Sequence, residues 1–153
     1  MKLKRWLTVP LVAVIAAVVV AVVTPGTAQA ATYDGADPIA TGCANTAITA
    51  KASNIYNEGV TVIGQIQLRY STACRTVWAR ILAYDTPYQA TGGVTRDTDL
   101  YTFYCHNPTW SSSLGAYSCF TKMLNDRNVT SYAYGYAAQY YGGTVFYNDT
   151  PSY

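Results

Sequence analysis

Charged side chains are scarce in this 153-residue sequence, in which Asp, Glu, Lys and Arg make up only 12% of the residues. His106 is the only histidine, so any Ser–His or Cys–His mechanism would have to use it. It follows Cys105 and precedes Asn107-Pro108 in a polar segment without periodicity. We therefore interpret His106 as a solvated loop residue rather than a catalytic one.

Carboxylates are also few, which limits acid–base catalysis of the kind that glycoside hydrolases perform with two of them. Glu58 is the only glutamate and precedes Gly59 in a predicted turn. Asp97 and Asp99 lie beside Arg96, an arrangement that favours a surface ion pair. We expect a non-catalytic protein without a cofactor, and keep a small secreted hydrolase with carboxylate catalysis as an alternative.

The sequence has no C-x-x-C pair, which argues against a structural zinc site, and we assign no metal ligand. Its four cysteines are Cys43, Cys74, Cys105 and Cys119. Four cysteines allow three pairings. We favour Cys43–Cys74 and Cys105–Cys119, because the second bond would tie the ends of one hairpin.

Only one long apolar run is present, at residues 7–23. Lys2, Lys4 and Arg5 precede it, and the small-x-small site Ala28-Gln29-Ala30 follows it, as in a secretory signal peptide. We predict a signal peptide at residues 1–30 and a single secreted, extracellular domain at residues 31–153. No second apolar run of membrane length follows, so we expect no membrane association after cleavage.

An excess of positive charge is lacking as well once the leader is set aside. Residues 31–153 carry seven Lys and Arg against eight Asp and Glu, a net charge of −1. The sequence pI of about 8.3 is therefore a property of the leader. This balance gives no electrostatic basis for binding nucleic acid or an anionic membrane. We expect a monomer whose partner is an unidentified extracellular ligand.

Alternating apolar and polar residues dominate the central stretch, residues 59–82. From Val60 to Tyr70 the even positions are mostly apolar and the odd ones polar, with Ile63 as the exception. This period of two indicates a strand with one dry face. A second strand rich in β-branched and aromatic residues follows at 76–82, and Cys74 lies at the corner between them.

The other segments predict further short strands. A strand is favoured over a helix at residues 44–53, and the remaining strands are expected at 100–105, 115–123, 129–141 and 144–147. Residues 85–97 and 106–114 are predicted loops, and Gly142-Gly143 is the last hairpin turn. Seven or eight strands of this length predict an all-β fold, a small disulfide-stabilised barrel or sandwich.

Three motifs together resemble a known family. They are Asp37-Pro-Ile-Ala-Thr-Gly-Cys43, Ile66-Gln-Leu-Arg-Tyr-Ser71, and Cys74 followed by Trp78-Ala-Arg-Ile81. The pattern is similar to the Gram-positive domain-of-unknown-function family 2690, closely from residue 33 to 82 and more loosely to about 136. The resemblance implies a compact, β-rich, disulfide-linked domain outside the membrane. It supplies no catalytic residues.

Tyrosine is the most abundant aromatic residue, and all fifteen tyrosines lie in residues 31–153. Tyr132, Tyr134 and Tyr136 alternate with small residues, Ala133, Gly135 and Ala137. Small side chains suit packing against a core, so we expect the three rings to project outward. Tyrosine is common at binding surfaces because it stacks on ligands and still forms hydrogen bonds. We predict a binding face for a cell-envelope or carbohydrate ligand.

Arginines form a second group of candidates, at Arg69, Arg75 and Arg80. An arginine fork matches a carboxylate or phosphate, so these residues are candidates for an anion site. The structural alternative, which we favour, is that they stack on Trp78 or Tyr70 and pair with acidic residues, namely Asp85, Asp97 or Asp99. A third function stays open, a protease inhibitor that presents the tied loop 105–119.

Overall fold

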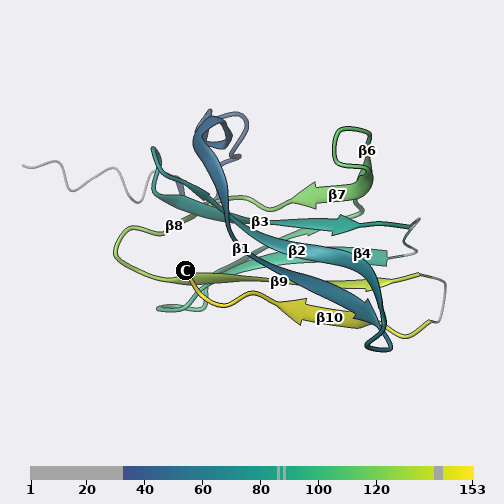
Figure 1. Cartoon of the computed structure of the whole chain (residues 1–153). Helices are drawn as coiled ribbons and strands as arrows, with labels where there is room; N and C mark the ends of the chain where they lie inside the picture. Colours follow the sequence, from purple (N-terminus) through teal and green to yellow (C-terminus); the bar gives the residue numbers. More distant parts are fainter. Residues whose placement is uncertain (1–32, 86, 88, 140–142) are drawn as a thin grey trace, which may run out of the picture.

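Two antiparallel β-sheets lie face to face in the computed structural model of the protein (Figure 1). The structure describes residues 33–85, 87, 89–139 and 143–153. The expected signal peptide, residues 1–30, lies outside the described residues. The helical part of the described chain is a 3-10 turn, η2 (Cys43–Thr46).

The large sheet contains six strands. Its order is β1 (Ala47–Asn57), β2 (Thr61–Ser71), β3 (Thr76–Ala83), β7 (Ala116–Phe120) and β6 (Thr109–Ser111), and β8 (Leu124–Asn125) pairs with the free half of β3. The small sheet contains four strands, in the order β10 (Phe146–Asp149), β9 (Ser131–Ala138), β4 (Gln89–Arg96) and β5 (Thr102–His106). The C-terminus continues beside the start of β9, where Tyr153 and Ser131 exchange backbone hydrogen bonds.

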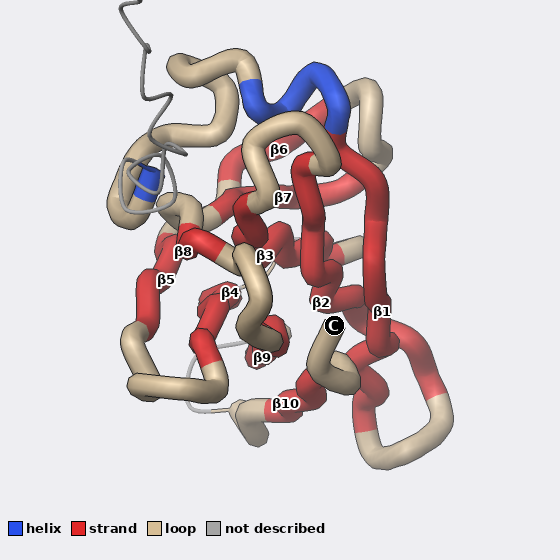
Figure 2. Tube along the Cα trace, turned by 90° about the vertical axis from the view of Figure 1, so that its left-hand side faces the viewer, coloured by secondary structure: helices blue, strands red, loops and turns tan. Residues whose placement is uncertain are grey.

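The two sheets form a sandwich rather than a closed barrel (Figure 2). The all-β, disulfide-stabilised fold predicted from the sequence is confirmed, and the sandwich is the correct one of its two architectures. The described part of the chain has ten strands rather than seven or eight, because β4 was predicted as a loop and because β6 and β8 are only three and two residues long. Such short strands leave too few residues for a recognisable alternation.

The prediction of a loop at residues 85–97 is wrong, because most of that segment is strand β4 in the middle of the small sheet. Its Gly92-Gly93 pair imitates a turn in the sequence. In the structure Gly92 faces the core, where an added Cβ would lie 3.3 Å from Ile81 Cβ and 3.5 Å from Cys105 Sγ. The glycine is required by close packing between the sheets and not by chain reversal.

Other local predictions were closer. The strand expected at residues 44–53 is present from Ala47 onward, after the 3-10 turn η2. The predicted loop at 106–114 contains the short strand β6. The last hairpin pairs β9 with β10 antiparallel, with Tyr136 opposite Tyr147. The predicted turn residue Gly142 lies outside the described residues.

Near β9, the core between the sheets combines bulky residues from the large sheet with small residues from the small sheet. The large sheet contributes Ile66 and Ile81, both fully buried. The small sheet contributes alanines and glycines such as Ala133 and Gly135. A Cβ added at Gly135 would lie 2.9 Å from Ile81 Cδ1. A larger residue there would push the sheets apart, so this contact fixes their separation.

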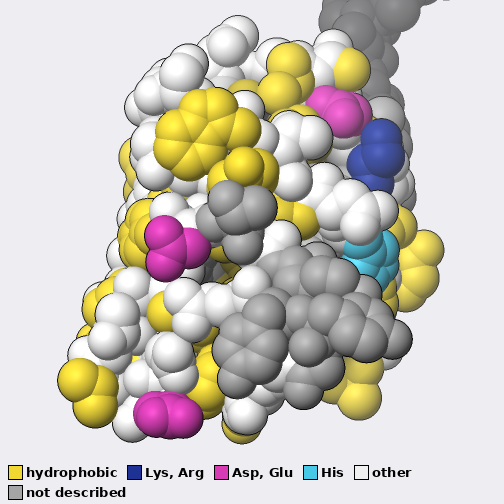
Figure 3. Space-filling view, turned by 90° about the vertical axis from the view of Figure 1, so that its right-hand side faces the viewer, with side chains coloured by type: hydrophobic (Ala, Val, Ile, Leu, Met, Phe, Trp, Pro, Cys, Tyr) yellow, Lys and Arg dark blue, Asp and Glu magenta, His cyan; other side chains and the backbone are white. Residues whose placement is uncertain are grey.

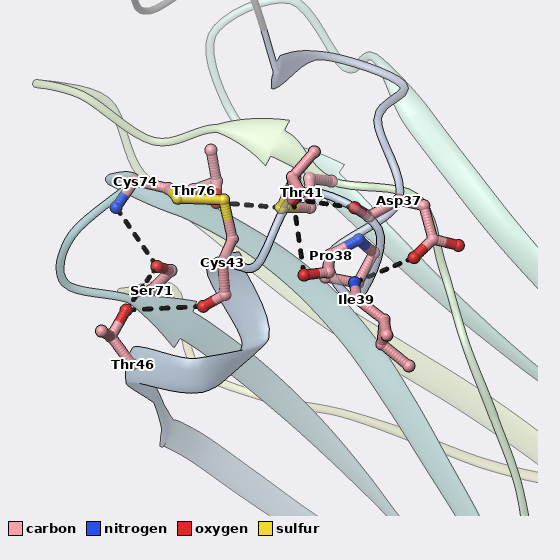
Figure 4. The surroundings of a disulfide bond; sticks show 10 residues. Asp37, Pro38, Ile39, Thr41, Cys43, Thr46, Ser71, Cys74 and Thr76 are labelled. Carbon is pink, nitrogen blue, oxygen red and sulfur yellow. Dashed lines mark hydrogen bonds between the residues drawn. A yellow bond between two sulfur atoms is a disulfide. The ribbon is translucent and has the colours of Figure 1, made fainter.

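The two disulfides have the expected pairing, but one has an unexpected role. Cys105 lies on β5 and Cys119 on β7, so this bond joins the two sheets. The expectation that it ties one hairpin is therefore wrong, because the chain crosses from the small to the large sheet between β5 and β6. Cys43–Cys74 ties η2 to the β2–β3 turn (Figure 4).

The N-terminal segment, residues 33–46, packs on the outer face of the large sheet. Cys43, Trp78 and Met123 form a small buried cluster beneath it, separate from the main core. At its start, Asp34 accepts a hydrogen bond from Arg96 Nη1 at 2.9 Å, and Arg96 Nη2 also reaches Asp99 at 2.6 Å. These contacts raise the pKa of Arg96 and lower the pKa of Asp99.

The cross-sheet disulfide generates a stability prediction. Replacing Cys105 and Cys119 with alanine releases a loop with a sequence separation of 14. We expect the free energy of unfolding to fall by about 3 kcal/mol, the chain-entropy value for a loop of this length. Urea denaturation of the variant and the parent measures the difference. Unchanged stability, or peptide mapping that links Cys105 to Cys43 or Cys74, would contradict the arrangement.

A second prediction concerns Asp126, which is buried and accepts a 2.8 Å hydrogen bond from Ser131 Oγ. The pKa of Asp126 is raised to about 6, mainly by burial. The Ser131 hydrogen bond opposes this increase, and the charge of Asp97 adds to it. The folded state therefore binds the Asp126 proton more tightly than the unfolded state. This contribution to the free energy of unfolding is favourable near pH 4 and is lost as the pH rises through about 6.

Asp126→Asn removes this titration and keeps an oxygen that accepts from Ser131. We expect the variant to gain stability relative to the parent at pH 7, and to gain less or nothing at about pH 4. Urea denaturation at both pH values provides the comparison. An equal stability difference at the two pH values would show that Asp126 does not titrate in this window.

Candidate binding site

The outer face of the small sheet gathers the tyrosines of strand β9. Tyr132, Tyr134 and Tyr136 are half-buried on this face, whereas Ala133 and Ala137, between and after them, are fully or almost fully buried on the inner face. The orientation follows from the alternation of side chains along a strand. Since the core accepts only small residues at this point, the large rings lie on the outside.

The neighbouring strands complete this outer face. On β4 the residues beside the three tyrosines are small: Thr95 pairs with Tyr132, Gly93 with Tyr134, and Thr91 with Tyr136. On the far side of β4, strand β5 contributes Thr102, Tyr104 and His106 in the same three rows. On this face, aromatic rings and hydroxyl groups of β9 and β5 thus flank β4, whose side chains are small.

Gly93 allows the Tyr134 ring to settle directly onto the sheet. A Cβ added at Gly93 would lie 2.7 Å from Cε1 and from the hydroxyl oxygen of Tyr134. Any other residue would therefore displace the ring. From this position Tyr134 meets Tyr104 edge to face, with ring centroids 5.9 Å apart, and tilts against Tyr132 at 6.2 Å.

Burial, followed by a hydrogen bond with Tyr104, raises the pKa of the Tyr134 hydroxyl above its ordinary value. Tyr134 therefore stays protonated at neutral pH and can act as donor or acceptor. The Tyr104 ring stacks on His106 at 5.9 Å, and His106 Nδ1 lies 3.0 Å from Thr91 Oγ1. The tyrosines are consequently held by one another rather than free to rotate.

A shallow groove of about 440 Å³ runs across this face. Tyr104 and Tyr147 at its margin remain 53% and 74% exposed, so their rings are accessible to a ligand. Asp149 is the one charged residue among those that line it. The groove is lined by Thr95, Leu100, Thr102, Tyr104, Tyr132, Tyr134, Tyr147 and Asp149.

Sequence reasoning identified Tyr132 and Tyr134 of the groove but missed Tyr104 and Tyr147. The predicted strand at 100–105 placed Cys105 on one side, and the same alternation places Tyr104 on the other. This alternation identifies the outward side of β5, but it does not show which strands lie beside β5 in the sheet. Tyr136 shares the face with the groove but does not line it.

The candidate arginines lie elsewhere. Arg69 on β2 and Arg80 on β3 belong to the outer face of the large sheet, on the other side of the molecule from the tyrosines. Among the described residues neither has a carboxylate partner. The favoured ion pairs with Asp85, Asp97 or Asp99 are therefore absent, since Arg96 holds Asp99. Arg75 donates a 3.4 Å hydrogen bond to Asn128.

The carboxylates considered for catalysis are not brought together as a pair. Glu58 lies in the β1–β2 turn, next to Asn57, which donates to Gln139 just after the end of β9. Asp97 accepts from Thr130 just before the start of β9. The two acids thus lie near opposite ends of β9. Residues 130 and 139, which mark these ends, are about 30 Å apart at the usual rise, too far for a glycosidase pair.

His106 and the disulfide-tied segment also differ from their predictions. His106 ends strand β5 and joins the aromatic face instead of a free loop. The disulfide-tied segment 105–119 contains strand β6 and most of strand β7, and the exposed Trp110 of β6 contacts Tyr117 of β7 edge to face at 5.3 Å. The segment is therefore partly strand, and its role as an inhibitor loop stays a prediction.

Comparisons with known proteins place the chain in a family. The sequence profile described as "Protein of unknown function (DUF2690)" matches residues 31–134. The chain belongs to this family. The uncharacterized protein YjfA of Bacillus subtilis (strain 168) is 36% identical over 117 residues, which are 72% of this chain and 74% of that protein. No solved structure matches the chain significantly.

The family assignment confirms the resemblance carried by the Gly-Cys, Leu-Arg-Tyr-Ser and Trp-Ala-Arg-Ile motifs. The matched region ends at Tyr134 and so includes β1 to β8 and the first part of β9. No helix in the described part of the chain is long and apolar enough to cross a membrane.

Gly93→Ala tests the seat of the Tyr134 ring. We expect the new methyl group to displace this ring and to shift the NMR resonances of both Tyr134 and Tyr104. Gly92→Ala is the matched control, because its methyl group points into the core toward Ile81 and Cys105. Gly92→Ala should lower the free energy of unfolding and leave the resonances of the Tyr134 and Tyr104 rings in place. Unchanged ring resonances in Gly93→Ala would contradict the close approach.

Proposed function

We propose that this protein is a secreted, non-catalytic binding domain that holds a neutral carbohydrate of the cell envelope or its surroundings in the tyrosine-lined groove. The observation that carries the proposal is the groove itself. Accessible tyrosine rings surround it, threonine hydroxyls lie between them, and a single carboxylate, Asp149, stands at its edge. The two disulfides support an oxidising compartment.

The chemistry of the lining matches a sugar better than a charged ligand. The faces of Tyr104, Tyr132 and Tyr147 offer flat apolar surfaces for the C–H groups of a pyranose ring, at about 0.5 to 1.5 kcal/mol for each aromatic contact. Thr95 and Thr102 offer hydroxyls, although they also hydrogen-bond to each other at 2.8 Å. Asp149 provides a charged acceptor, which forms stronger hydrogen bonds with sugar hydroxyls than a neutral one.

Preorganisation adds to this argument. The Tyr134 ring is fixed by Gly93 below it and by Tyr104 and Tyr132 beside it. A ring already held in place loses little conformational entropy when a ligand binds. Charged side chains are also sparse on the end of the molecule shown in Figure 3, in keeping with the 12% of charged residues in the sequence.

Replacement of tyrosines that line the groove tests the proposal. We expect Tyr134→Ala and Tyr147→Ala to remain folded, because both rings lie outside the core, and to lose binding to a neutral oligosaccharide by about tenfold or more. A glycan array selects the oligosaccharide, and isothermal titration gives its affinity for each variant.

Tyr56→Ala is the matched control, because Tyr56 is 42% exposed on β1 in the other sheet and lies outside the groove. It should bind like the parent. If Tyr134→Ala and Tyr147→Ala both keep full affinity, the groove is not the binding site. If neutral glycans fail to bind the folded parent while charged ones bind, the proposed ligand class is wrong.

A further inference from the structure

The outer face of the large sheet holds two arginines side by side. Arg69 lies opposite Trp78 in the β2–β3 ladder, and Arg80 lies opposite Gln67. Arg69 and Arg80 are therefore diagonal neighbours, whose Cβ atoms are about 7 to 8 Å apart in such a ladder. The indole of Trp78, 4% exposed, separates the sheet backbone from the N-terminal segment next to them.

These arginines line a pocket of about 170 Å³ between the sheet and the N-terminal segment. The other lining residues have mainly apolar side chains. The full lining consists of Pro38, Ile39, Ala44, Ala47, Arg69, Trp78, Arg80 and Phe120. A ligand of this pocket would meet guanidinium groups on one side and hydrocarbon on the others.

The wall formed by Pro38 and Ile39 is held in place by local contacts (Figure 4). Asp37 accepts hydrogen bonds from the backbone N–H of Ile39 at 2.9 Å and of Ala40 at 3.1 Å. The disulfide Cys43–Cys74 fixes the turn that follows. The pocket is thus built before any ligand arrives, which reduces the entropy lost on binding.

Both guanidinium groups have donors to spare. Arg69 donates to Thr49 Oγ1 and to the Ala47 carbonyl oxygen, and Arg80 donates twice to Gln67 Oε1. All of these acceptors are neutral. Since a guanidinium has five N–H groups, each arginine keeps three that no described protein acceptor receives.

The charge of the pair is also uncompensated by any carboxylate of the described residues. Burial lowers the pKa of Arg69, and burial together with the charge of Arg69 lowers the pKa of Arg80. Two like charges that are partly withdrawn from water repel each other more strongly than they would in bulk solvent. An anion between them would offset this repulsion with two attractions.

We propose that this pocket binds a carboxylate attached to a small apolar group, with Arg69 and Arg80 on the carboxylate and Trp78, Ile39 and Phe120 around the apolar group. The site lies on the opposite side of the molecule from the tyrosine groove and does not depend on the function proposed for that groove. The same chemistry is offered by a free organic acid and by the C-terminus of a peptide that ends in an apolar residue.

Benzoate is the probe for the free acid, with benzamide as its neutral analogue and sulfate as an anion without an apolar group. We expect the dissociation constant of benzoate to lie at least about tenfold below those of benzamide and sulfate, because both halves of the pocket contribute. A short apolar peptide with a free or an amidated C-terminus distinguishes the second source. Isothermal titration with the mature protein measures each affinity.

Arg80→Gln should weaken benzoate binding by about tenfold or more, and Arg69→Lys should weaken it less, since the charge remains and the planar fork is lost. Arg127→Gln is the control, because it removes the same charge at an exposed turn and should leave binding unchanged. Thermal unfolding verifies that each variant is folded.

If Arg80→Gln does not fold, the affinity of Arg69→Lys for benzoate tests the proposal, because this change preserves the charge at a strand position. The proposal is overturned by equal binding of benzoate and benzamide, or by benzoate binding that the arginine variants leave unchanged. It is also overturned by the absence of carboxylate binding from both the free acid and the peptide. Preference of the pocket for the free peptide C-terminus over benzoate supports the site and identifies a peptide source.

Discussion

Close contact between the two sheets at Gly92 and Gly135 is the constraint on which the rest of the structure depends. The side chains of Ile66 and Ile81 occupy the space that a Cβ at these glycines would need. Because protein interiors are packed nearly to crystal density, the large sheet can be bulky here only if the small sheet is not. The Cys105–Cys119 bond holds the sheets together beside this contact.

This constraint determines what the outer face of the small sheet can carry. The inner side of β9 is filled by alanine and glycine, so the aromatic residues of this strand stand on the opposite face. The central strand β4 is small on both faces, and the ring of Tyr134 lies down over Gly93 until it meets Tyr104. An aromatic surface on so small a domain is therefore a consequence of the way its core is packed.

The two outer faces of the sandwich are chemically different. The small sheet presents tyrosines and hydroxyls with a single carboxylate in its groove. The large sheet presents Trp78 and two arginines that have no carboxylate partner among the described residues, and the N-terminal segment covers part of it. Arg96 links that segment to the small sheet through Asp34. One domain thus has an aromatic groove on one face and an arginine-lined pocket on the other.

The sequence by itself determined the features that depend on neighbouring residues. A period of two predicted the strands and the outward direction of Tyr132, Tyr134 and Tyr136, because successive side chains alternate between faces. Only the tertiary structure decided which strands lie together, because that depends on contacts between distant segments. In the tertiary structure, a segment with a loop-like sequence forms β4, and Cys105–Cys119 joins the two sheets. Tyr104 and Tyr147 lie at the groove. Arg69 and Arg80 lack the expected acidic partners among the described residues.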